Sequence, residues 1–319
     1  MRFAIAPEQA DFVAGLRRLL AAADTPAVLR ASIAGDHAPA RALWARLADL
    51  GVSALAVPQR YGGLGATPVD LALAFVELGR AGVPGPAVES VAILPCLLGQ
   101  VAPERLEPLL AGSVIATVAA PPLAPRAADC DAADEVYLCE AGTLSLAAVQ
   151  RRERSVDRSR TLATVSATSV LGEVDAGAAI GLGFLASAAG LLGAGEAVLE
   201  QAARYATQRV QFGRPIGAFQ AVKHLLADAR VGLELARPVL FGGALSVGTG
   251  DEARDVSAAR VCCADAAYRA ARAALQVHGA IGYTAEHDLS LWLTRIRALQ
   301  HAWGTQRWHR SRVLAELTG

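Results

Sequence analysis

The feature that most constrains this chain is a succession of four long helical segments that fills residues 178–319. Apolar residues recur at helical spacing, with only short connections, over Ile180–Arg209, Phe219–Val247, Ala253–Gly279 and Ser290–Leu317. Long helices with short connections pack as antiparallel neighbours, so the pattern predicts an up-and-down four-helix bundle. Small residues widen the apolar faces of these helices. Faces of this kind often extend into subunit contacts, which favours an oligomer.

The rest of the chain divides into a helical part and a β-rich part. Residues 1–112 have helical spacing, interrupted by a glycine-rich loop at Val57–Gly65. Residues 113–177 instead carry short runs rich in Val, Thr and Ser at Val114–Ala119, Glu135–Leu138 and Thr161–Val165. The predicted fold is therefore mostly α, with an N-terminal helical domain (1–112), a small β-rich middle domain (113–177) and a C-terminal four-helix bundle (178–319).

Composition excludes several classes of function. Lys+Arg and Asp+Glu balance at 30 each, which leaves no electrostatic footprint for nucleic acid or an anionic membrane. Charges every few residues near the start of the chain predict neither a signal peptide nor a membrane span, so a cytoplasmic protein is expected. The five cysteines and six histidines lack the spacing of metal ligands, and no metal site is predicted. The charge run Arg151–Arg154 favours a solvated hairpin or loop over an anion site.

Three stretches of the bundle carry specific motifs. Tyr205–Ile216 reads YATQRVQFGRPI, Phe219–Asp228 reads FQAVKHLLAD, and Gln276–Tyr283 reads QVHGAIGY, followed by Glu286-His287-Asp288. Together with the Val57–Gly65 loop, these stretches resemble the signatures of the acyl-CoA dehydrogenase family. Four matches in the family order span nearly the whole chain, so the resemblance is specific.

The resemblance implies FAD as cofactor and an acyl-CoA as substrate. Arg209 ends a helical run beside a Phe-Gly turn, where its guanidinium can reach a diphosphate while Phe212 packs against flavin or adenine. In the family, the matching residues contact the FAD of the neighbouring subunit. The alternatives are a surface arginine paired to an acid and, for Gly279, a plain helix-ending glycine. The candidate cofactor-binding residues are Arg209, Phe212, Gln220, Gln276, His278, Gly279 and Thr305.

The reaction that the family catalyses, α,β-dehydrogenation of an acyl-CoA thioester, needs a carboxylate that removes the α-proton. In most members this glutamate directly precedes a late Gly-Thr, but here Trp303 precedes Gly304-Thr305. A minority carries the base on an early bundle helix, at a position that matches Gly183 or its neighbour. Neither Trp303 nor Gly183 accepts a proton, so no catalytic residue is predicted.

The middle domain also departs from the family pattern. Ala116–Pro122 lacks the flavin-binding Thr-Glu-Pro stretch of the family, and the domain is shorter than usual. The first hypothesis is therefore a subunit of an α2β2 heterotetramer, in which a homologous acyl-CoA dehydrogenase chain supplies the base and a bulky, steroid-type acyl group fits the reduced domain. The second is a homomeric flavoenzyme with an unrecognised base, such as Glu286 or Asp288, or with different flavin chemistry. The third is a structural or regulatory subunit without flavin contact.

Overall fold

The N-terminal part of the protein is a group of helices around one central helix. The structure is a computed structural model that describes residues 5–318. Its N-terminal α-helices are α1 (Pro7–Ala21), α2 (Thr25–Ile33), α3 (Ala38–Asp49), α4 (Pro68–Ala81), α5 (Leu94–Val101) and α6 (Leu106–Leu110). The central helix α4 begins at a capping box, in which Thr67 and Asp70 satisfy each other's backbone N–H groups, and ends at Gly82 in a left-handed conformation.

Two segments between these helices are irregular. The stretch predicted as a loop, Val57–Gly65, contains only a short 3₁₀ turn at Gln59–Tyr61. Between α4 and α5, Val88–Ile93 forms a π-helical segment, η3. Segments of this kind are rare and occur often at functional sites.

The middle part is a five-stranded sheet with the order β1-β3-β4-β5-β2. Its strands are β1 (Ala116–Ala119), β2 (Ala127–Ala128), β3 (Glu135–Glu140), β4 (Thr143–Arg154) and β5 (Thr161–Glu173). Only the β1–β3 pair is parallel. Each predicted run contains all or part of a strand, whereas the short β2 and the long β4, which ends in the charge run Arg151–Arg154, lie outside the predicted runs. This run lies in a long hairpin with β5.

The C-terminal part contains five α-helices, where the sequence predicts four. They are α7 (Gly177–Gln208), α8 (Gln220–Ser246), α9 (Glu252–His278), α10 (Leu289–Leu299) and α11 (Gln306–Thr318). The prediction of one helix over Ser290–Leu317 is wrong, because the chain turns between α10 and α11. Trp303 (φ 53°) and Gly304 (φ 90°) both have left-handed backbone there, which a continuous α-helix does not allow. The prediction of a mostly α fold with a small β part is confirmed; the residues at which the three parts divide stay a prediction.

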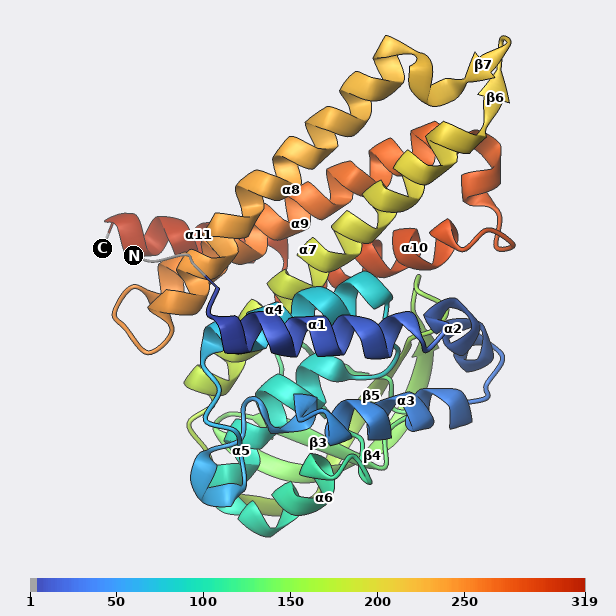
Figure 1. Cartoon of the computed structure of the whole chain (residues 1–319). Coiled ribbons are helices and arrows are strands. Elements are labelled where there is room, and N and C mark those ends of the chain that lie inside the picture. Colours follow the sequence, from blue (N-terminus) through green and yellow to red (C-terminus); the bar gives the residue numbers. More distant parts are fainter. Residues whose placement is uncertain (1–4, 319) are drawn as a thin grey trace.

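Helices α4 and α7 connect the N-terminal part to the bundle, and their backbones approach each other closely. A Cβ added at Gly79 would lie 2.0 Å from the Gly190 carbonyl oxygen, and one added at Gly193 would lie 1.8 Å from that of Val76. Only glycine permits this approach. Figure 1 shows α7, α8 and α9 running past this contact and projecting beyond the rest of the molecule. Helix α7 is long and apolar enough to cross a membrane, but 78% of its most apolar window is buried inside the protein, as in a core helix.

One buried guanidinium connects all three parts. Arg295 of α10 donates from Nε to Asp157 Oδ2 at 2.9 Å, and from Nη2 to Ser159 Oγ at 2.9 Å, both in the turn between β4 and β5. Its Nη1 donates to the carbonyl oxygens of Gly82 and Val83, each at 2.6 Å, just after α4. Burial would raise the pKa of Asp157, but Arg295 and Ser159 outweigh it and hold that pKa below its usual range.

We expect Arg295→Met to lower the free energy of unfolding by about 3–5 kcal/mol, because removal of one partner leaves the Asp157 charge buried and unpaired. Urea unfolding followed by circular dichroism measures the change. The matched control is Arg297→Met, on the exposed side of the same helix, which should stay within about 0.5 kcal/mol of the parent. Equal losses in the two variants would contradict the connecting role of Arg295.

Candidate functional site

The predicted cofactor residues at the end of α7 lie on a small projecting hairpin. Its strands β6 (Val210–Gln211) and β7 (Arg214–Pro215) are joined by Phe212-Gly213, both with positive φ, as a tight two-residue hairpin turn requires. Phe212 stands at the tip with 91% of its side chain exposed. Arg209 is the residue that ends α7 and is exposed as well.

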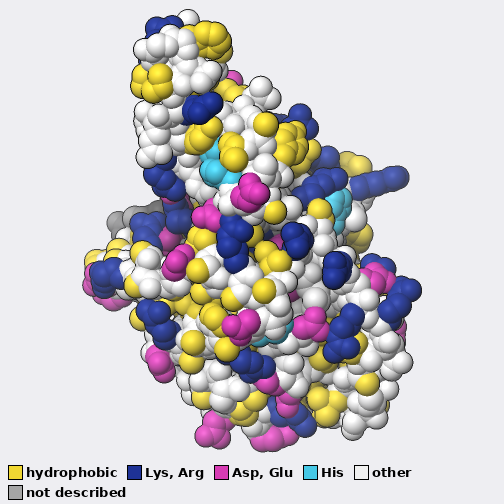
Figure 2. All heavy atoms as spheres, turned by 90° about the vertical axis from the view of Figure 1, so that its right-hand side faces the viewer, with side chains coloured by type: hydrophobic (Ala, Val, Ile, Leu, Met, Phe, Trp, Pro, Cys, Tyr) yellow, Lys and Arg dark blue, Asp and Glu magenta, His cyan; other side chains and the backbone are white. Residues whose placement is uncertain are grey.

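The same end of the molecule favours an anionic group. No carboxylate among residues 5–318 lies within 4.0 Å of the Arg209 guanidinium, so the alternative of a paired surface arginine does not hold there. Helix α8 begins beside the hairpin at Gln220, with no side-chain cap and no acidic residue in its first turn. Its free N–H groups and positive dipole end therefore add to the Arg209 charge. Figure 2 shows basic and hydrophobic side chains together on this projecting end.

Helix α9 ends next to the hairpin and presents two of the predicted residues. Gln276 and Gly279 are exposed. Gly279 has φ 64°, and a Cβ added there would meet nothing within 4 Å, so the surface is open for close approach. Gly279 also donates its N–H to the Leu275 carbonyl oxygen, so its role as a helix-ending glycine holds too.

His278 has a different environment from its exposed neighbours. Its side chain is buried, its ring stacks on Tyr205 of α7 with centroids 4.3 Å apart, and its Nδ1 donates to the Ala274 carbonyl oxygen at 2.8 Å. Burial lowers its pKa, which keeps the ring neutral. His278 therefore ties α7 to α9 and does not face the open surface.

Thr305 lies at the opposite end of the bundle. Its hydroxyl accepts from Trp308 N–H at the start of α11. Four residues further along the chain, in α11, His309 Nδ1 lies 3.3 Å from Ser257 Oγ. Thr305 is therefore near the start of α9. At about 1.5 Å of rise per residue, the length of α9 from Ser257 to Gln276 is roughly 30 Å. The fold thus gathers six predicted residues at the hairpin end and separates Thr305 from them.

The residue at the usual base position is locked in the core. Trp303 is 2% exposed, and its Nε1 donates to Glu89 Oε1 at 2.9 Å. Burial lowers the pKa of His309 to about 4, so the neutral ring donates from Nε2 to the Trp303 carbonyl oxygen at 3.0 Å. Buried Arg260 also stabilises the turn, because its Nη2 donates to the carbonyl oxygens of Leu299 and Ala302.

A side chain at the alternative base position would displace Ile93 from its present place. A Cβ added at Gly183 would lie 2.6 Å from Ile93 Cδ1. The two other candidate acids lie elsewhere: Asp288 pairs with Arg30 at 2.7 Å, and the Glu286 carbonyl oxygen accepts from the same arginine. Neither lines the cavities beside Trp303.

Sequence reasoning missed one carboxylate in this region. Glu89, in the π-helical segment η3, is 4% exposed and bonded to Trp303. Burial raises its pKa, and Arg160 and the indole offset the effect in part. The sequence signal for Glu89 is its place as an acid within an otherwise apolar run. That pattern does not predict its hydrogen bond with Trp303. Buried acids with raised pKa values are frequent at active sites.

Two cavities meet at Glu89 and Trp303. One, of about 460 Å³, lies between the sheet and the end of α10 and is lined by Arg126, Arg154, Arg297 and His301 among others. The other, between α4 and α7, is only about 70 Å³ because these helices touch through glycine. The small cavity does not accommodate an acyl chain. The exposed hairpin end, in contrast, carries a guanidinium without a carboxylate partner, the start of a helix and an exposed aromatic ring.

Comparison with known proteins agrees with this organisation. Residues 6–101 match the family model described as acyl-CoA dehydrogenase, N-terminal domain, and residues 176–318 match acyl-CoA dehydrogenase, C-terminal domain. Acyl-CoA dehydrogenase IpdE2 of Mycolicibacterium smegmatis is 33% identical over 298 residues, covering 92% of this chain and 93% of the relative.

Two solved assemblies share the fold. The ChsE4-ChsE5 complex of Mycobacterium tuberculosis superposes with a TM-score of 0.83 at 24% identity and 99% coverage of both chains. The Tcur3481-Tcur3483 steroid ACAD gives a TM-score of 0.80 at 20% identity and 97% coverage of both. At these identities the likeness concerns the fold alone, whereas the matches to IpdE2 and to the two family models show the family of the chain. The chain belongs to the acyl-CoA dehydrogenase family of FAD-dependent oxidoreductases.

Proposed function

We propose that this chain is the subunit of a heteromeric acyl-CoA dehydrogenase that contributes FAD contacts across a subunit boundary, while a homologous chain supplies the base. One contrast carries the proposal. The hairpin end is exposed and suited to a dinucleotide, whereas the two base positions hold a buried Trp303 and Gly183, which carries no acid and packs closely against Ile93.

The residues of this chain bind and orient; they do not transfer the proton. Arg209 and the free N–H groups at the start of α8 would hold the FAD phosphates, and Phe212 would cover an aromatic ring. Gln276 and Gly279 would border the same ligand. FAD, when bound, accepts a hydride from the β-carbon of the acyl-CoA. The α-proton passes to a carboxylate of the partner chain.

The relatives support a partner and a bulky substrate. The name of the ChsE4-ChsE5 complex gives two different chains, and the Tcur3481-Tcur3483 protein is called a steroid enzyme. The proposed assembly is a heterotetramer of two copies of each chain, acting in the cytoplasm on a large, steroid-type acyl-CoA. The glycine contact between α4 and α7 supports the view that the partner holds the acyl group.

A second candidate function rests on Glu89. Its buried carboxyl group stands 2.9 Å from the indole of Trp303, the residue at the usual base position, and borders both cavities. A homomeric enzyme would use this acid as the missing base. Among the described residues Glu89 is better placed for that role than Glu286 or Asp288, because those two lie outside the cavities.

Expression with and without the partner separates the two functions. We expect the chain alone to purify with little FAD and without dehydrogenase activity, because half of a binding site lacks its complement. Co-expression with a homologous chain should restore both, as measured by flavin absorbance per protomer and turnover of a steroid acyl-CoA. A flavin-replete homomer whose activity is abolished by Glu89→Gln would favour the second candidate and refute the first.

Arg209→Ala tests the cofactor contact directly. A charge-assisted hydrogen bond to a phosphate is worth roughly 1.5–3 kcal/mol, so in the complex FAD affinity should fall about one to two orders of magnitude. Flavin fluorescence during titration of the apo-complex measures the dissociation constant. Because Arg209 is exposed, the unfolding temperature should change little.

Arg204→Ala is the matched control, since Arg204 is an exposed arginine five residues earlier on α7. It should leave the FAD dissociation constant unchanged. Excess FAD should restore activity to the Arg209→Ala complex without moving the pH at which the base titrates. If both variants bind FAD like the parent, Arg209 is a structural residue.

A further inference from the structure

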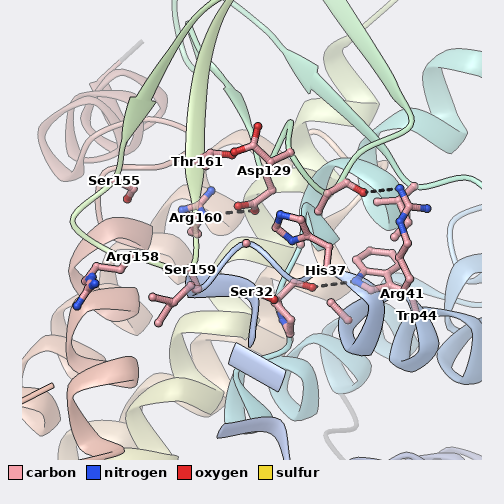
Figure 3. Close-up of a pocket in the computed structure, with 18 of the residues that line it drawn as sticks. Ser32, His37, Arg41, Trp44, Asp129, Ser155, Arg158, Ser159, Arg160 and Thr161 are labelled. Atoms are coloured by element: carbon pink, nitrogen blue, oxygen red, sulfur yellow. Dashed lines mark hydrogen bonds and ion pairs between the residues drawn. The ribbon is translucent and has the colours of Figure 1, made fainter. Parts of the chain in front are cut away.

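A third cavity, which is polar, lies on another side of the molecule from the hairpin. It has a volume of about 210 Å³ and is enclosed by the α2–α3 connection, α3 and the turn between β4 and β5. Figure 3 shows Arg158 and Ser155 on one side of this cavity and His37, Arg41 and Trp44 on the other. A volume of this size equals roughly seven water molecules in the liquid.

The floor of this cavity contains two hydrogen-bonding atoms without partners. Asp129 is 4% exposed, and its Oδ1 has no donor; the buried Oγ1 of Thr161 likewise lacks a partner among the described residues. Both residues line the cavity. The other carboxylate oxygen of Asp129 faces Arg160 Nε at 3.6 Å, as drawn in Figure 3. Buried polar atoms in native proteins are satisfied by protein, water or ligand, so these two atoms require a partner from outside the chain.

The backbone of Asp129 is held in an unusual conformation. Its φ is 56°, in the left-handed region, and its N–H donates to the Thr161 carbonyl oxygen at 2.7 Å. This bond joins the floor residues to each other. Burial raises the pKa of the Asp129 carboxyl to about 6, against the opposite effect of Arg160, so the group is an acceptor at neutral pH.

Two exposed arginines of the β4–β5 hairpin add positive charge to the cavity. Arg154 and Arg158 line the cavity, are exposed, and have no carboxylate within 4.0 Å anywhere in residues 5–318. The other charged groups on the lining are already engaged: Arg41 pairs with Asp134 at 2.7 Å, and Asp131 pairs with Arg152 at 2.7 Å. The cavity thus offers two exposed guanidinium groups without carboxylate partners and two buried oxygen atoms without donors.

The free arginines and the free oxygen atoms together favour a ligand that carries both an anionic group and a hydrogen-bond donor. An anionic group would bind the arginines in charge-assisted hydrogen bonds, and an O–H or N–H donor on the same molecule would satisfy Asp129 and Thr161. A purely apolar molecule would leave these groups unpaired. Independently of the function proposed above, we propose that the cavity binds a small anion that also carries hydroxyl donors, of the class of hydroxy acids and hydroxylated phosphate monoesters.

Calorimetric titration of the full-length chain, with its partner where one co-purifies, tests this site with four probes. Glycerol 3-phosphate and lactate carry both ends, acetate carries only the anion, and glycerol carries only the donors. We expect saturable binding of at least one two-ended probe, at least ten times tighter than either one-ended probe. The choice between glycerol 3-phosphate and lactate identifies the anionic group.

Two variants locate the binding. Arg158→Gln removes one guanidinium and Thr161→Val removes one buried oxygen without removing either member of the Asp129–Arg160 pair, and each should weaken binding at least tenfold. Arg151→Gln is the control: this arginine is exposed on the same hairpin, pairs with Glu153 and does not line the cavity. Equal affinity of the one-ended and two-ended probes, equal loss in Arg151→Gln and Arg158→Gln, or no saturable binding by any probe would each overturn the proposal.

Discussion

The Arg295 guanidinium is the point at which the N-terminal helices, the sheet and the bundle depend on one another. Five donors of an arginine can be satisfied in a buried place only by a fixed set of acceptors, and here the acceptors come from two other parts of the chain. The β4–β5 turn is therefore fixed against α10. That turn contributes lining residues to both the large cavity beside Trp303 and the polar cavity of Figure 3, so one ion pair sets the shape of two cavities.

The two ends of the bundle serve opposite purposes. At one end, the turn that contains Trp303 is buried and bonded to Glu89, His309 and, through its neighbours, Arg260. At the other end, the hairpin leaves Arg209 and Phe212 free. Close packing fixes the Trp303 turn, which occupies the position where most members of the family carry the base. The hairpin residues are not packed in this way, so they stay accessible to a ligand from another subunit.

Much of the fold could be predicted from the sequence because long helices carry their own signal. Periodicity located α7, α8 and α9 within a few residues, and the motifs identified the family. The division between α10 and α11 escaped prediction because Trp303 takes a positive φ, which an apolar pattern does not reveal. The burial of His278 escaped it as well, since the stacking partner Tyr205 is distant in sequence. Glu89 and Asp129 could not be recognised as candidate functional residues from the sequence, because the residues around them in the fold are distant along the chain. The cofactor role of the hairpin residues stays a prediction.

The hydrogen bond from Trp303 to Glu89 also gives this protein a built-in optical reporter. The indoles of Trp44 and Trp292 donate to the backbone carbonyl oxygens of Pro84 and Arg80, which do not titrate, and Trp308 is partly exposed to solvent. Trp303 alone among the four has a carboxyl group as its acceptor. A protonation step at Glu89 would therefore act directly on one buried indole, so that the charge state of the core can be followed by fluorescence without any label.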